Sequence, residues 1–129
     1  DDMLETVMDN EFNLIFLPGG KLGTDNLKND LRIVKLLQKM QNQGKYISAI
    51  CAAPTILQKA GIVNSRSITC HPSVKSQFDA YIDDRVVIDG KLVTSQSPGT
   101  AMELALKLVE ILLGVDRMKK VNAGVLALD

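Results

Sequence analysis

The chain has 129 residues, 46% of them hydrophobic, which suits one domain with a real core and is too short for two. Lys and Arg together number 15, as do Asp and Glu, so the formal net charge is zero. A neutral chain has no net electrostatic field that would attract nucleic acid or an anionic membrane surface. No apolar run reaches the roughly 20 residues that span a bilayer, and no secretion signal is recognisable. With only two cysteines, a reducing, cytoplasmic environment is predicted.

The chain opens at Asp1 and Asp2 without an initiator Met, and Leu4, Val7 and Met8 share one face of a short helix. These features are typical of a chain that begins partway through a larger protein. We therefore expect the 129 residues to be one domain that is incomplete at its N-terminus.

The first half of the chain alternates predicted strands and helices. An apolar run over 12–17 reads as a buried strand, closed by the tight turn Pro18-Gly19-Gly20. Residues 21–25 are expected to form a loop, followed by a helix that is capped near residues 29–30 and ends at Gly44. A second strand is predicted over 46–50, and a short helix follows over 52–60.

The second half begins with an expected buried strand over 67–69. Residues 85–95 then form a predicted hairpin, because Asp89-Gly90 is a strong turn signal between two apolar runs. A long amphipathic helix starts at a capping box made by Thr100 and Glu103 and ends at Gly114. Another short helix and an extended tail complete the chain.

This alternation predicts an α/β fold of the flavodoxin-like or Rossmann-like type, with a mostly parallel sheet and helices on both faces. Sites in such sheets lie beyond the carboxyl ends of the strands. The Pro18-Gly19-Gly20 turn, Cys51 and the segment "SQSPGT" (95–100) all follow predicted strands. The pattern therefore indicates a functional site at this end of the sheet.

Cys51 lies where the strand over 46–50 gives way to a helix. Pro54 is suited to a first helical turn, so Cys51 is expected at the positive end of that helix, where a thiolate is favoured over a thiol. Small neighbours such as Ala52 leave room for a nucleophile elbow, the strand–turn–helix arrangement of many hydrolases. A free cysteine is also often just a small buried residue, and the pattern alone does not choose between the two readings.

Four segments at consistent spacings carry a resemblance to a known family. They are "LIFLPGG", "AICAAPTIL", "ITCHPSVK" and "LVTSQSPGTAMELALKLVEILLG". Together they resemble the ThiJ/PfpI superfamily, and specifically its DJ-one (DJ-1) branch, which includes the Parkinsonism-associated protein deglycase. The resemblance runs from about Phe12 to the C-terminus and identifies the chain as the C-terminal portion of such a protein.

The resemblance implies roles for particular residues. Cys51 would be the nucleophile and the oxidation-sensitive residue, and His71 would lie near the pocket as a second catalytic residue. The Gly19-Gly20 turn and Ala52 would provide backbone N–H groups for an oxyanion, through Gly20 and Ala52. Ser97 and Pro98 would border the pocket and a subunit interface. No cofactor or metal is implied.

Two features depart from the family pattern. Protease-like members carry a histidine directly after the nucleophile, whereas Ala52 stands here, so a peptidase is disfavoured. The family also has a glutamate on additional N-terminal strand and helix segments, where it hydrogen-bonds the cysteine. None of Glu5, Glu11, Glu103 and Glu110 matches that position. An N-terminal complementary segment of the same protein is therefore an expected partner.

The resemblance implies a cysteine-dependent deglycase or glutathione-independent glyoxalase. The substrates would be methylglyoxal, glyoxal or their early adducts, and the protein would be a homodimer. The alternative is an oxidative-stress sensor or redox-regulated chaperone in which Cys51 is oxidised to sulfinic acid. A cysteine peptidase and a role in thiamine biosynthesis are weaker alternatives.

Four side chains keep a simpler interpretation open. His71 is either a pocket histidine or a structural one, and Cys70 is expected to be a packed thiol rather than a second nucleophile. Lys21 and Lys28, close to the first turn, either attract anions or are ordinary surface lysines.

Overall fold

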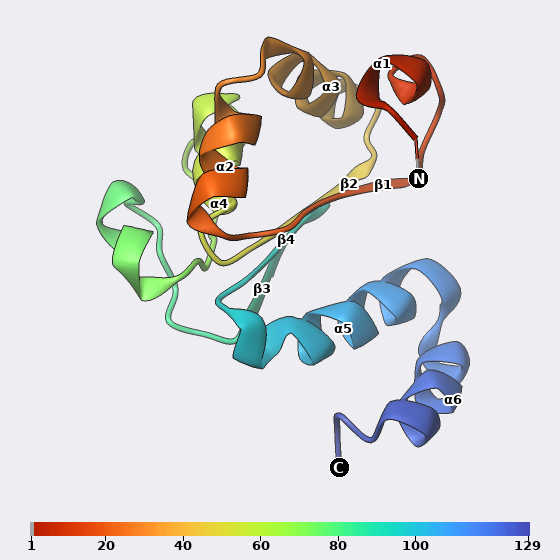
Figure 1. Ribbon diagram of the computed structural model, residues 1–129. Helices are drawn as coiled ribbons and strands as arrows, with labels where there is room; N and C mark the ends of the chain where they lie inside the picture. Colours follow the sequence, from red (N-terminus) through yellow and green to blue (C-terminus); the bar gives the residue numbers. More distant parts are fainter. Residues whose placement is uncertain (1) are drawn as a thin grey trace.

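The computed structural model of the protein describes residues 2–129, which form a four-stranded open sheet with helices on both faces (Figure 1). The strands are β1 (Leu14–Leu17), β2 (Tyr46–Ile50), β3 (Val86–Asp89) and β4 (Leu92–Ser95). The α-helices are α1 (Leu4–Val7), α2 (Lys21–Lys28), α3 (Leu31–Asn42), α4 (Pro54–Lys59), α5 (Ala101–Leu113) and α6 (Val115–Val125). Two short 3₁₀ turns, η1 (Pro72–Gln77) and η2 (Pro98–Thr100), precede β3 and α5.

The sheet has the order β1-β2-β4-β3. β1 pairs with β2 and β2 with β4 in parallel, while β3 and β4 form the antiparallel hairpin predicted around Asp89-Gly90. Gly90 has a φ of 61°, the left-handed conformation that this kind of tight turn needs. The predicted α/β fold with a mostly parallel sheet is therefore confirmed.

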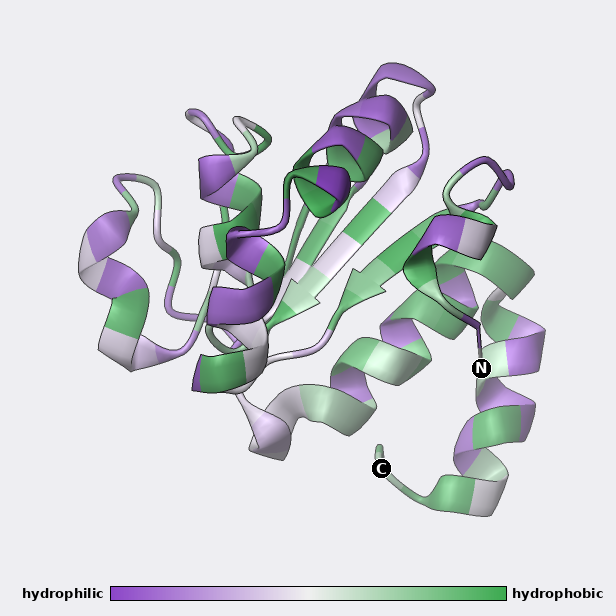
Figure 2. Cartoon of the chain, turned by 45° about the horizontal axis from the view of Figure 1, so that its top comes forward, coloured by the Kyte–Doolittle hydropathy of each residue, from purple (hydrophilic) through white to green (hydrophobic). Residues whose placement is uncertain are grey.

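Two apolar layers enclose the sheet. Ile47 and Ala49 of β2 face α3 and α4 and join the larger core, whereas Ile50 packs with Val93 and Leu104 on the side of α5. In Figure 1, α2, α3 and α4 lie on one side of the strands, and α5 and α6 on the other. Figure 2 shows hydrophobic colour along the strands and mixed colour on the helices, as expected for helices with one buried face.

Three local predictions are wrong. Residues 21–25 lie in helix α2 and do not form a loop. Residues 67–69 form no strand, because only Ile68 makes an isolated bridge, to Tyr81. Thr100 does not share a capping box with Glu103: the Thr100 hydroxyl bonds to the preceding turn, and Glu103 pairs with Arg85 at 2.6 Å.

β1 is an edge strand whose outer side is unpaired within residues 2–129. It contains no charged residue and no proline, the features by which proteins usually protect a free edge. Phe16 on this strand is 44% exposed. Among the same residues, none of the helices is long and apolar enough to cross a membrane.

Candidate functional site

Cys51 occupies a strained turn directly after the central strand β2. Its φ is 65°, which is uncommon for a residue with a side chain. Two hydrogen bonds hold the turn: the Cys51 N–H donates to Ser95 O at 3.1 Å, and the His71 N–H donates to Cys51 O at 2.7 Å. Residues 51–53 form this turn and α4 begins at Pro54, two residues later than predicted. The half-buried Cys51 thus lies before the N-terminus of α4 and is separated from it by Ala52 and Ala53.

The Pro18-Gly19-Gly20 turn lies against this cysteine. A Cβ added at Gly19 would meet Cys51 Cβ at 2.6 Å, Ile50 O at 3.0 Å and Cys51 Sγ at 3.4 Å. Only a residue without a side chain fits so close an approach. Gly20 has a φ of 89° and occupies the N-cap of α2. The turn after β1 and the turn after β2 are therefore in direct contact.

Backbone N–H groups around Cys51 are free for a ligand. Within residues 2–129, neither the Gly20 nor the Ala52 N–H donates a hydrogen bond to the protein. The Ala52 carbonyl is occupied, since it accepts from the Thr55 hydroxyl at 2.8 Å and so holds the turn onto α4. Free N–H groups fixed by tight turns are suited to stabilising a developing negative charge.

His71 is linked to Cys51 through the backbone, and its ring has a structural role. Its Nδ1 caps η1 by accepting a hydrogen bond from the Ser73 N–H at 3.1 Å, and it lies 2.8 Å from Ser73 Oγ. Because Nδ1 accepts from a backbone N–H, the ring carries its proton on Nε2 when neutral. The half-buried imidazole therefore combines a capping role with a position next to the elbow.

Cys70 is fully buried in the larger core. Burial, and secondarily the negative charge of Cys51, raise the pKa of the Cys70 thiol to about 11. A thiol with this pKa is almost entirely protonated near neutral pH, and the thiolate is the nucleophilic form. Both cysteines are free thiols. Cys70 is thus a packing residue.

Ser97 and Pro98 lie in the turn that follows β4. The Ser97 N–H donates to Thr100 Oγ1 at 3.1 Å, and the Thr100 N–H donates back to Ser97 O at 3.0 Å. The buried Thr100 hydroxyl also lies 2.6 Å from Ser95 Oγ. Since Ser95 O accepts from the Cys51 N–H, this network connects the Ser97-Pro98 turn with the elbow.

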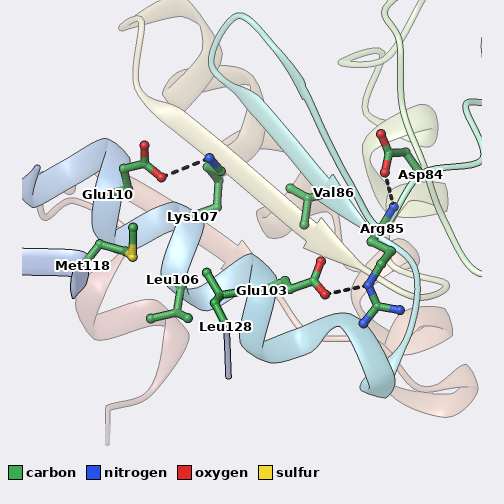
Figure 3. A pocket seen from close by; sticks show the side chains of 9 residues that line it. All are labelled: Asp84, Arg85, Val86, Glu103, Leu106, Lys107, Glu110, Met118 and Leu128. Atoms are coloured by element: carbon green, nitrogen blue, oxygen red, sulfur yellow. Dashed lines mark hydrogen bonds and ion pairs between the residues drawn. The ribbon is translucent and has the colours of Figure 1, made fainter. Parts of the chain in front are cut away.

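Three of the four glutamates form ion pairs with basic side chains. Figure 3 shows a pocket between β3, α5 and the C-terminal tail in which Arg85 pairs with Glu103 at 2.6 Å and Lys107 with Glu110 at 3.0 Å. Glu5 pairs with Arg32 at 3.1 Å. In residues 2–129 no cluster of three or more His, Cys, Asp or Glu side chains could hold a metal ion.

Sequence reasoning missed several residues that support the site. Ser95 and Thr100 anchor the turn after β4, and Arg85 holds that turn through a hydrogen bond from its guanidinium to Gly99 O at 2.8 Å. Two small polar residues, Thr94 and Ser95, at the end of a strand that begins with Leu92 and Val93 were the available signal for Ser95. Nothing in the chain order indicates the partner of Arg85.

The fold and the elbow define an α/β protein with a cysteine held on a strained strand-to-helix turn at the carboxyl edge of the sheet. A model of the DJ-1/PfpI family matches residues 1–111. The chain belongs to the DJ-1/PfpI family.

Curated relatives and solved structures agree with this assignment. Protein dj-1beta of Drosophila melanogaster is 40% identical over 130 residues, covering 98% of this chain and 70% of the relative. Glutathione-independent glyoxalase DJR-1.2 of Caenorhabditis elegans is 42% identical over 121 residues, which cover 91% of this chain and 64% of the relative. Drosophila DJ-1beta (40% identity) and an oxidized Toxoplasma gondii DJ-1 (33%) superpose with TM-scores of 0.95 and 0.94. Each match covers 98% of this chain and 70% of the solved one.

Proposed function

We propose that the protein is a cysteine-dependent glyoxalase or deglycase, acting on methylglyoxal, glyoxal or their early adducts with amines and thiols. The observation that carries the proposal is the contact between the two turns. Gly19 packs against the strained Cys51, and the N–H groups of the adjacent residues Gly20 and Ala52 donate no hydrogen bond within residues 2–129. A relative named as a glutathione-independent glyoxalase supports this choice of chemistry.

The proposed reaction begins when the Cys51 sulfur bonds to the aldehyde carbon of methylglyoxal. The carbonyl oxygen then carries negative charge, which the Gly20 and Ala52 N–H groups stabilise, and protonation gives a hemithioacetal. A proton next moves from the hemithioacetal carbon to the neighbouring carbonyl carbon. The hemithioacetal hydroxyl loses its proton, and the neighbouring carbonyl oxygen gains one, which gives a lactoyl thioester. Water then hydrolyses the thioester to lactate and the free thiol. His71 assists proton transfer together with a carboxylate from a further segment.

Replacing Cys51 with alanine tests this chemistry. We expect methylglyoxal consumption to fall at least about a thousandfold, because no other thiol can form the covalent intermediate. Cys70→Ala is the matched control and should retain turnover, since the buried Cys70 thiol takes no part. Equal rates of methylglyoxal consumption by the wild type and Cys51→Ala would rule out the proposed mechanism.

A redox sensor or chaperone is the second candidate. The solved Toxoplasma gondii relative described as oxidized favours it, and so does the half-buried position of Cys51, which remains accessible to peroxide. Mass spectrometry after mild peroxide treatment separates the two functions. Selective addition of two oxygens at Cys51 without any aldehyde turnover would favour the sensor.

A complementary segment of the same protein is the proposed occupant of the free β1 edge. Apolar hollows lie on both sides of this strand, one between Phe16 and α5 and the other between Phe16 and α3. An added strand would complete the hydrogen bonding of β1 and cover both hollows. The same segment is the expected source of the carboxylate near Cys51.

Hydrogen exchange on protein purified from its natural source tests this assignment. We expect the outward-facing β1 amides to exchange slowly. We also expect either an intact mass above the 14.1 kDa of these 129 residues or a second polypeptide that co-purifies with them. Amides of the buried β2 are the internal reference for slow exchange. A 14.1 kDa species with rapidly exchanging β1 amides would contradict the proposal.

We further propose that the protein forms a homodimer and is located in the cytoplasm. Exposed apolar side chains on the C-terminal helices, such as Leu113 at 66%, are compatible with a subunit interface. The Ser97-Pro98 turn, next to the elbow, would border it.

A further inference from the structure

A hollow of about 210 Å³ lies between α2, α4 and η1, next to the elbow but outside the reacting atoms described above. Ala52 forms part of its wall, so the hollow begins one residue from the nucleophile. Lys21, Thr24, Asp25 and Lys28 of α2 line the other side. The hollow therefore borders the elbow through Ala52.

The charges that line this hollow leave one cation free. Lys21 and Asp25 neutralise one another through an ion pair of 3.3 Å. Lys28 is half-buried, and within residues 2–129 its ammonium group makes no ion pair or hydrogen bond. The unbalanced charge of the hollow is thus a single positive charge, which favours a negatively charged ligand.

The polar lining supports the same interpretation. Thr24 is 2% exposed, and its Oγ1 has no hydrogen-bond partner in the described part of the chain. A buried hydroxyl without a partner is costly and is usually satisfied by water or a ligand. Thr55, on the opposite wall, is engaged with Ala52 O and keeps that wall in place. The α2 wall of the hollow therefore carries the unpaired cation Lys28, and the Thr24 hydroxyl without a protein partner is buried beneath the surface of this wall.

We propose that this hollow binds the anionic end of the substrate, a carboxylate on the thiol or amine part of a dicarbonyl adduct, with Lys28 as the residue that selects it. The inference rests on the proposed function and names its preferred substrate class. Adducts that carry a carboxylate would be bound more tightly than neutral adducts of the same size. Free methylglyoxal, which has no such group, would not use the hollow.

Two stable ligands test the proposal by calorimetric titration at low ionic strength. The acetonyl thioether of mercaptoacetate carries a carboxylate, and the acetonyl thioether of 2-mercaptoethanol is its neutral counterpart. We expect the wild-type protein to bind the first about three- to fivefold more tightly, a preference typical of one partly exposed charge pair. Lys28→Met should reduce the preference to less than about twofold, whereas Lys28→Arg should retain it.

Lys35→Met is the matched control, because it removes the same charge from an exposed position on α3 and should leave the preference unchanged. Equal binding of the two ligands by the wild type, no binding of either, or a preference that survives Lys28→Met would overturn the proposal. The titration is repeated with Cys51→Ala, in which the carboxylate preference should persist. Because binding needs no turnover, failure of the proposed chemistry would show in the methylglyoxal assay and not here.

Discussion

Replacing Gly19 with alanine is expected to lower methylglyoxal turnover about a hundredfold or more and to reduce the free energy of unfolding by about 1–3 kcal/mol. The new methyl group would lie 2.6 Å from Cys51 Cβ and 3.0 Å from Ile50 O. Neither atom is the end of a flexible side chain, so the turn itself must move and take the Gly20 N–H with it. Rate measurements and urea unfolding quantify the two effects.

Gly23→Ala is the matched control for this substitution. Gly23 lies within α2 and has nothing within 4 Å of an added Cβ. Alanine should therefore leave turnover unchanged and stabilise the protein by about 0.5–1 kcal/mol, because it is the better helix former. If Gly19→Ala behaved like Gly23→Ala, the close packing of the two turns would have no functional importance.

Replacing Ile56 with alanine should lower the free energy of unfolding by about 2–5 kcal/mol. Ile56 is fully buried in the larger core and belongs to α4, the helix that supports the elbow. Its loss leaves a cavity that rigid neighbours cannot fill completely. Urea denaturation followed by circular dichroism measures the change.

Ile88→Ala serves as the comparison, since the Ile88 side chain on β3 is 46% exposed. Removing it should cost less than about 1 kcal/mol, because much of its surface already contacts water. Similar losses for the two substitutions would show that the α4 layer does not form the dominant core.

Sequence patterns were sufficient for the elements that define the site. An apolar run that stops at Cys51, followed by Pro54, predicts the strand, the turn and the helix, since each signal is local. Asp89-Gly90 predicts the hairpin for the same reason. These segments follow their intrinsic preferences, and the structure agrees with them.

Other features depend on contacts between distant segments. Residues 21–28 contain Gly23 and Asn26, which are poor helix formers, yet they form α2 because the segment packs beside α4. Glu103 is placed where a capping box would need it, but Arg85, from a remote loop, binds it instead. Such partners are not visible in the chain order.

The free charge of Lys28 belongs to the same category. Its sequence position is that of any surface lysine, and only the folded chain shows the hollow around it and the pairing of its neighbour Lys21 with Asp25. The strained φ of Cys51 is equally a tertiary property, because Ser95 and His71 impose it through hydrogen bonds.

The proposed chemistry requires a covalent bond between Cys51 and the substrate, formed next to the Gly20 and Ala52 N–H groups. Carbon NMR with methylglyoxal labelled at its aldehyde carbon observes that bond directly. We expect a hemithioacetal resonance with the wild type that is absent with Cys51→Ala, accompanied by shifts of the Gly20 and Ala52 amides. A resonance that persists in Cys51→Ala, or one that appears without any change at those two amides, would contradict the account.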